Sequence, residues 1–274
     1  MMKKDSNSVV KVYVLVLLAI VLLLAPSCKK SPEEDSPSGG SQSAPNQTQL
    51  QSTNNAKDKA DKVDAAAPKL VPSIVEGLVP IDIKLPKAMF IGTPQNIRVP
   101  NLEKPLGRPR PPFLAPVGTK NVAFGKPVAS TDEEPIIGEI EMITDGDKKG
   151  ADGSYVELGP FLQNVTIDLG AEYDIYAILL WHFHKQARVY LDVVVQVADD
   201  PDFITNVRTL FNNDIDNSSG LGLGSDMHYV ETAEGKLIDA KGVRARYVRL
   251  YSNGNSSNEL NHYIEVEVFG TPIL

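Results

Sequence analysis

The sequence contains a single cysteine, Cys28, among its 274 residues. One thiol excludes an intramolecular disulfide and any zinc site built from several cysteines. The short signatures of common hydrolases are also missing, since there is no Gly-x-Ser-x-Gly and no His-Glu-x-x-His. Carboxylates are plentiful, but no pair is marked as an acid and a base. We therefore expect a protein that is not an enzyme.

Positive charge is scarce in the second half of the chain. Residues 1–119 hold 15 Lys and Arg against 10 Asp and Glu, whereas residues 120–274 hold 12 against 25. Phosphate binding requires a basic surface, so the acidic half argues against nucleic acid and against anionic lipid headgroups. The same surface suits a divalent cation.

Residues 1–27 have the pattern of a secretory signal peptide. Three lysines precede an uncharged apolar run over residues 12–25, which is short of the roughly 20 residues that span a bilayer. The run ends in "APSC", which resembles the lipobox of bacterial lipoproteins. That resemblance implies that Cys28 carries lipid and, with Lys29 following, that the protein is sorted to the outer membrane of the cell envelope. A free thiol after an ordinary signal, or an uncleaved anchor, is the alternative.

Two segments of different texture follow. Residues 28–67 are rich in Ser, Pro, Gly, Gln, Asn, Lys and Asp, and such a segment buries too little apolar surface to order, so we expect a disordered tether. Residues 68–119 combine many prolines with Ile, Val, Leu and Phe. Prolines exclude long helices and central strands, so we expect an extended, proline-rich arm that packs along the next domain. Alternatively, "RPRPPFLAP" is a PxxP-type partner motif.

From residue 120 to residue 274 the pattern is that of β-strands. Short β-branched and aromatic runs are separated by turn residues, and no segment of twelve or more residues shows a helical period. This pattern predicts an all-β, antiparallel sandwich or barrel. The runs cover residues 164–170, 173–183, 191–200, 207–213, 245–254 and 263–270.

Six segments in order resemble the discoidin, or F5/8 type C, domains, which are related to family 32 carbohydrate-binding modules. They are "NVAFGKPVAS", "ITDGD", "NVTIDLGAEYDIYAILLW", "VVVQVADDPDF", "RARYVRLY" and "YIEVEVFG". The resemblance implies an eight-stranded jelly-roll sandwich of the galactose-binding-like fold. Members bind sugars, lipid headgroups or proteins through loops at one end and are seldom catalytic alone. The sequence departs from the pattern after Asp147, where Tyr155 stands in for the usual Trp, and over residues 211–229.

A calcium site is the first candidate that the resemblance supplies. Asp145 and Asp147 flank Gly146, and two carboxylates so close in sequence can converge on one hard cation. In related modules a structural Ca²⁺ is held by carboxylates that match Asp145, Asp147 and Glu265, and Ser154 is a candidate hydroxyl ligand. The alternative is an ordinary Asp-Gly turn and a solvated Glu.

The segment "WHFHKQARVY" is a candidate sugar contact. Imidazole and guanidinium groups donate hydrogen bonds to hydroxyls, and aromatic faces pack on sugar C–H groups. Two histidines alone do not make a zinc site, which needs three or four protein ligands. The alternative is a core tryptophan with hydrogen-bonded histidines in a turn. The candidates are Trp181, His182, His184, Arg188 and Tyr190.

The polar stretch over residues 211–229 is a second candidate. It lacks the spacing of an EF-hand and the Lys-Ser/Thr of a phosphate loop. Its amides and carboxylates suit a polyhydroxyl ligand, whereas the alternative is a self-bonded turn. The candidates are Asn212, Asn213, Asp214, Asp216 and Asn217.

Together these patterns predict a lipid-anchored protein of the bacterial cell envelope that binds a glycan without catalysis. The membrane is reached through the lipid anchor only. The alternative function is an envelope scaffold or adhesion protein that binds another protein.

Overall fold

The computed structural model describes residues 77–90 and 96–273. The predicted signal peptide, the lipid site at Cys28 and the tether therefore lie outside the described residues. The chain divides into one unit over residues 1–67 and a second, compact unit over residues 68–274, and the description below concerns the second. Among the described residues, no helix is both long and apolar enough to cross a membrane.

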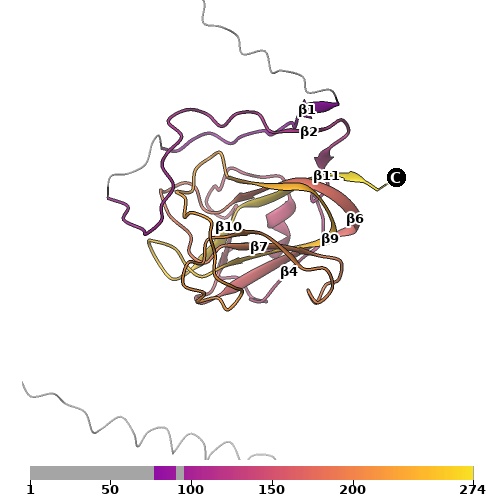
Figure 1. The fold of residues 1–274 in the computed structure, drawn as a ribbon. Helices are drawn as coiled ribbons and strands as arrows, with labels where there is room; N and C mark the ends of the chain where they lie inside the picture. The colour runs from indigo at the N-terminus through magenta and orange to yellow at the C-terminus, as the bar shows by residue number, and fades with distance from the viewer. Residues whose placement is uncertain (1–76, 91–95, 274) are drawn as a thin grey trace, which may run out of the picture. The chain divides into compact units, whose positions relative to one another are not determined.

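Nearly all regular structure in the described part of the chain is β-strand, with one 3₁₀-helix, η1 (Ile140–Thr144) (Figure 1). The strands in chain order are β1 (Leu78–Pro80), β2 (Leu114–Pro116), β3 (Lys120–Asn121), β4 (Val128–Ser130), β5 (Val156–Leu158), β6 (Gln163–Trp181), β7 (Val194–Ala198), β8 (Arg208–Asn212), β9 (Lys236–Ser252), β10 (Asn261–Tyr263) and β11 (Glu265–Pro272).

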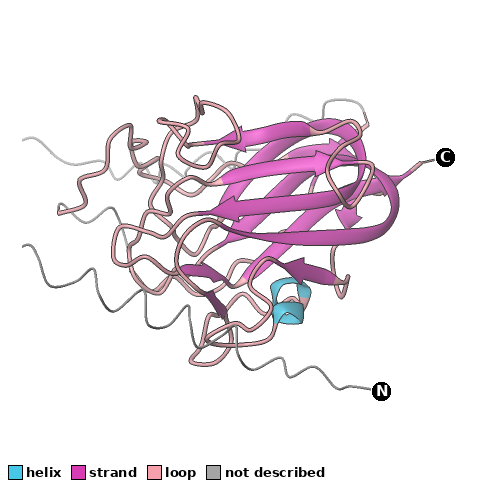
Figure 2. Cartoon of the chain, turned by 90° about the horizontal axis from the view of Figure 1, so that it is seen from below, coloured by secondary structure: helices cyan, strands magenta, loops and turns pink. Residues whose placement is uncertain are grey.

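The strands form a large antiparallel sheet with smaller pairs around it (Figure 2). The large sheet has the order β3-β11-β6-β9-β7-β8, and β4 pairs with the first half of β6. Two short pairs, β5 with β10 and β1 with β2, complete the described structure. The all-β, antiparallel class predicted from the sequence is confirmed.

The longest strand, β6, changes its burial pattern halfway along. In its first half Val165, Ile167 and Leu169 are buried and alternate with more exposed residues, as in a strand with one solvated face. A register shift after Asp168 interrupts the ladder with β9. From Ile178 onward every residue of the strand is buried, so both faces of the sheet are covered there.

The inner face carries the main core. Aliphatic side chains from β6, β7, β9 and β11 form one cluster, among them Ile178, Val195, Val248 and Val266, which are fully buried. One residue in two faces this core in the first half of β6, whereas every residue of β7 is buried.

The outer face is covered by the proline-rich arm. Ile81 and Ala115 belong to a second apolar cluster with Leu179, Trp181 and Phe269. The Trp181 indole is fully buried and its N–H donates to the backbone oxygen of Ala233 at 3.1 Å. The arm therefore supplies the outer layer that lets the end of β6 be buried on both sides.

Polar contacts fix the arm on the sandwich. The Arg110 guanidinium donates to the backbone oxygens of Glu234 and Gly235, each at 2.8 Å. Lys236 pairs with Glu103 at 2.8 Å, and the Glu103 N–H donates to the backbone oxygen of His228 at 2.8 Å. The arm is thus held at several separate points along its length.

We predict that a fragment starting at Lys120 is much less stable than one starting at Pro68. Loss of the arm exposes Leu179, Trp181 and Phe269, and burial of one large apolar side chain contributes about 1.5–3 kcal/mol. Urea unfolding should show a loss of about 3 kcal/mol or more, with Arg110→Ala in the longer fragment giving a smaller loss. Equal unfolding midpoints for the two fragments would show that the arm contributes nothing.

Candidate functional site

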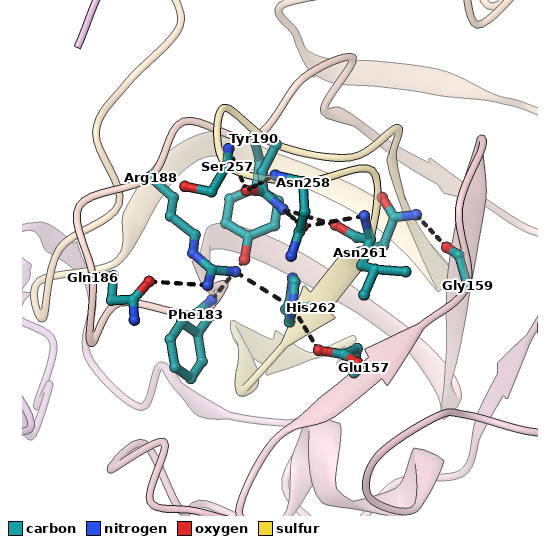
Figure 3. A network of polar contacts seen from close by, with 12 residues as sticks. Glu157, Gly159, Phe183, Gln186, Arg188, Tyr190, Ser257, Asn258, Asn261 and His262 are labelled. Carbon is teal, nitrogen blue, oxygen red and sulfur yellow. Dashed lines mark hydrogen bonds and ion pairs between the residues drawn. The ribbon is translucent and has the colours of Figure 1, made fainter. Parts of the chain in front are cut away.

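Three segments meet at one end of the sandwich and bring polar side chains together (Figure 3). Strands β5 and β10 pair so that His262 lies opposite Glu157. The segment after β6 is attached to the loop before β10 by two contacts. Tyr190 forms an isolated antiparallel β-bridge with Asn255, and the Val189 N–H donates to the Ser256 hydroxyl at 3.0 Å. These backbone contacts set the positions of the side chains described next.

His262 lies between the carboxylate of Glu157 and the guanidinium of Arg188. Its Nε2 atom is 2.9 Å from Oε2 of Glu157 and 3.4 Å from Nη1 of Arg188. The other terminal nitrogen of Arg188 donates to Oε1 of Gln186 at 3.0 Å. Gln186 is exposed, and Glu157 and Arg188 are half-buried, so the outer part of this cluster faces solvent.

The electrostatics of this cluster keep the imidazole neutral. Burial lowers the pKa of His262 to about 3, and the positive charge of Arg188 acts in the same direction. Burial raises the pKa of Glu157, while Arg188 opposes that shift. A neutral imidazole donates from Nε2 to the nearer oxygen of Glu157. Within residues 77–90 and 96–273, no carboxylate lies within 4.0 Å of the Arg188 guanidinium.

Aromatic rings border the same cluster. The Tyr155 and Phe183 rings are 4.9 Å apart between centroids, and the Arg188 guanidinium carbon lies 4.8 Å from the centre of the Phe183 ring. Both rings are half-buried. The cluster therefore offers guanidinium and amide donors, a carboxylate acceptor and apolar ring surface to one ligand.

Most of the predicted contacts in "WHFHKQARVY" are buried. Trp181, His182, His184 and Tyr190 have no exposed surface. His182 stacks on Tyr190 at 4.1 Å between ring centroids and its Nδ1 is 3.1 Å from Oε2 of Glu231, while Nε2 of His184 is 2.8 Å from the backbone oxygen of Lys148. A ligand on the surface cannot reach them in this structure. Arg188 alone among the five is partly accessible.

The stretch over residues 211–229 is folded on itself. Asn212, Asn213 and Asp214 are buried, and Oδ1 of Asn213 accepts from the Val193 N–H at 2.7 Å. Asp214 accepts from the Ser219 N–H and hydroxyl. Burial raises the pKa of Asp214, but these hydrogen bonds outweigh it, so the pKa lies below its ordinary value.

The outer part of that stretch is exposed but also internally bonded. Asp216 and Asn217 face solvent, and Oδ1 of Asn217 accepts from the Gly222 N–H at 2.7 Å. None of the described hydrogen bonds of residues 212–217 reaches residues 181–190. The two predicted halves of the sugar site are therefore not joined by a hydrogen bond among the described residues.

The predicted calcium ligands are only partly gathered. Glu265 is fully buried; its Oε2 accepts from the Gly146 N–H at 2.9 Å, and its Oε1 has no partner among the described residues. Burial raises the pKa of Glu265 to about 8, and Asp145 adds to this shift. A cation at the orphan oxygen would offset this burial, so Glu265 and Asp145 fit a Ca²⁺ ligand set.

Asp147 is bonded elsewhere, since its Oδ1 accepts from the Lys149 N–H at 3.0 Å. The carboxylates of Asp145, Asp147 and Glu265 do not all lie within 4.8 Å of one another. In the described part of the chain such an acidic group is formed instead by Asp192, Asp214 and Asp216. Serine N–H and hydroxyl groups bind this second group, with the Ser218 hydroxyl 2.7 Å from Oδ2 of Asp192.

No family model and no curated protein sequence matches this chain. One similar structure is the chitosan-binding module 1 of a chitosanase/glucanase from Paenibacillus sp. IK-5, with 18% identity, a TM-score of 0.41, and coverage of 55% of this chain and 99% of that one. Another is a fucose-binding module of Streptococcus pneumoniae, with 17% identity, a TM-score of 0.40, and coverage of 56% and 99%.

A family 89 glycoside hydrolase from Clostridium perfringens is also similar, with 22% identity and a TM-score of 0.40. The likeness covers 55% of this chain but only 14% of that enzyme.

Proposed function

We propose that this protein binds carbohydrate without catalysing a reaction, through the cluster of Arg188, Glu157 and Gln186 bordered by Tyr155 and Phe183. The observation that carries the proposal is the Arg188 guanidinium, which is half-buried on the Phe183 ring and has no carboxylate of the described residues within 4.0 Å. Desolvated donors of this kind are stabilised when a ligand supplies acceptors.

Neighbouring sugar hydroxyls match this arrangement of charges. A hydroxyl both donates and accepts, so one hydroxyl can accept from Arg188 while the next donates to Glu157. His262 separates the two charged groups and, being neutral, adds no competing charge. An affinity in the millimolar to micromolar range, about -4 to -8 kcal/mol, is expected for such a small contact.

We predict that Arg188→Ala reduces binding to the best glycan of an array by roughly tenfold or more, or about 1.4 kcal/mol. Arg208→Ala is the matched control, because Arg208 is also partly buried but pairs with Asp199 at 3.3 Å on the edge strand β8. Binding should be lost in the first variant and kept in the second, with little change in melting temperature for either. Equal binding by Arg188→Ala and the unaltered protein would disprove this site.

We propose a lipid anchor at Cys28, on the sequence pattern alone. The anchor would place the binding unit on the bacterial cell envelope, with residues 28–67 as a tether. Cys28→Ser should prevent both lipid attachment and removal of residues 1–27, as measured by metabolic labelling with a fatty acid and by the mass of the product. Lipid-labelled, processed protein from this variant would refute the anchor.

We propose a structural Ca²⁺ at Glu265 and Asp145, with Asp147 completing the ligand set once the cation is bound. A ligand that binds only the folded state stabilises it by about 2.7 kcal/mol at a hundredfold excess over its Kd. Removal of calcium by EDTA should therefore lower the melting temperature, and Glu265→Gln and Asp147→Ala should abolish that response. Superimposable melting curves in EDTA and in excess calcium would count against the site.

A further inference from the structure

A separate depression of about 480 Å³ lies beside the loop that precedes β10. Its lining includes Phe161, Leu191, Asn253, Ser257, Asn258 and Glu259. None of these residues belongs to the Arg188 cluster, and none is a candidate site residue in the sequence analysis. The depression combines one aromatic ring with several polar side chains.

Phe161 is presented to solvent in an unusual backbone conformation. Its side chain is 77% exposed and its φ is 69°, a left-handed value that a bulky residue rarely adopts. Such conformations persist only where the surroundings impose them, and they gather at ligand-binding positions. A phenylalanine that is 77% exposed contributes little to the core, so its ring is accessible to a ligand.

One buried amide imposes this conformation and joins both walls of the depression. The side-chain nitrogen of Asn261 donates to the backbone oxygens of Gly159 and Phe161, each at 2.9 Å. Its side-chain oxygen accepts from the Gly254 N–H at 2.8 Å, and Asn261 is fully buried. The hydrogen bonds of Asn261 therefore fix the backbone of Phe161 relative to the loop.

Several polar atoms of the lining remain available to a ligand. Asn255 is occupied within the loop, since its side chain bonds to Asn258 and Leu260. By contrast, no described hydrogen bond involves the side-chain nitrogen of Asn258, the Ser257 hydroxyl or the Glu259 carboxylate, and all three side chains are exposed. Donors, acceptors and an aromatic face thus lie around one hollow.

Strand β10 connects this hollow to the Arg188 cluster. Asn261 and His262 are consecutive, and successive side chains of a strand point to opposite faces. Accordingly, Asn261 supports the depression whereas His262 supports the Arg188 cluster. The segment that carries Arg188 also contacts the loop that lines the depression, because the Val189 N–H donates to the Ser256 hydroxyl at 3.0 Å.

We infer that the depression is a second contact surface for the same glycan, so that the ligand is an oligosaccharide chain and not a single sugar. This inference rests on the proposed function. Phe161 supplies a face for sugar C–H groups, and Asn258, Ser257 and Glu259 bond the hydroxyls. No cation of the described residues lies within 4.0 Å of the Glu259 carboxylate. The bound oligosaccharide is therefore neutral or carries amino groups and is not acidic.

The test measures how the affinity of the full-length protein depends on the length of the oligosaccharide. Oligomers of N-acetylglucosamine, glucosamine and galacturonic acid, each of one to six units, are titrated by calorimetry. Affinity for a neutral or amino series should rise roughly tenfold or more between one and four units, and the acidic series should show no such rise.

Variants separate the two surfaces. Phe161→Ala and Phe161→Gly should abolish the rise with length and leave single-sugar affinity unchanged, and Phe161→Gly should not lower the melting temperature because glycine accepts this φ. Ile204→Ala, an 80% exposed apolar residue outside the depression, is the control. Arg188→Ala should weaken every length.

The outcomes are distinct for the two ideas. An unchanged length dependence in both Phe161 variants overturns the second surface and leaves the proposed function standing. Normal binding by Arg188→Ala, with loss in the Phe161 variants, overturns the Arg188 site alone. If the protein binds none of the three oligomer series, the oligosaccharide inference is overturned. If it also binds no glycan on the array, the proposed function is overturned as well.

Discussion

The second half of β6 is the constraint on which the rest of the structure depends. Its residues are buried on both faces, because Ile178 and Leu180 face the main core while Leu179 and Trp181 face the arm. A strand is buried on both faces only where other parts of the chain pack against each face, here the main core on one side and the arm on the other. The arm is therefore a structural layer of this unit, and the direction in which β6 ends determines where residues 182–190 emerge.

Much of the fold could be predicted from the sequence because its strands carry regular patterns. The alternation of Val165, Ile167 and Leu169 predicts a strand with one buried face, and the structure has it. Two predicted runs, over residues 164–170 and 173–183, prove to be one strand with a register shift. The first part of β9 was missed, and strands as short as β5 and β10 have no detectable period, since their three residues pair only through tertiary contacts.

The candidate site was far less predictable, and the reason is burial. A histidine reads the same whether it is exposed or enclosed, so His182 and His184 were plausible ligands until the structure placed them in the core. His262 and Glu157 meet through a pairing between residues 105 apart in the chain, which no local pattern reveals. Only Arg188 could be named in advance, because it stands near aromatic residues in the same segment.

Hydrogen-bond satisfaction distinguishes the loops better than length or composition does. The long stretch over residues 211–229 has the most polar sequence, yet Asp214 and Asn217 direct their oxygens to its own backbone. Polar groups already bonded in this way gain little from a ligand. Residues 253–260 form a shorter loop in which Asn255 and the side-chain oxygen of Asn258 hold the turn, while the side-chain nitrogen of Asn258 and the Glu259 carboxylate make no described hydrogen bond. Polar groups that the internal structure of a loop leaves unbonded are available to a ligand, which is why the proposed second contact surface lies in residues 253–260 and not in residues 211–229.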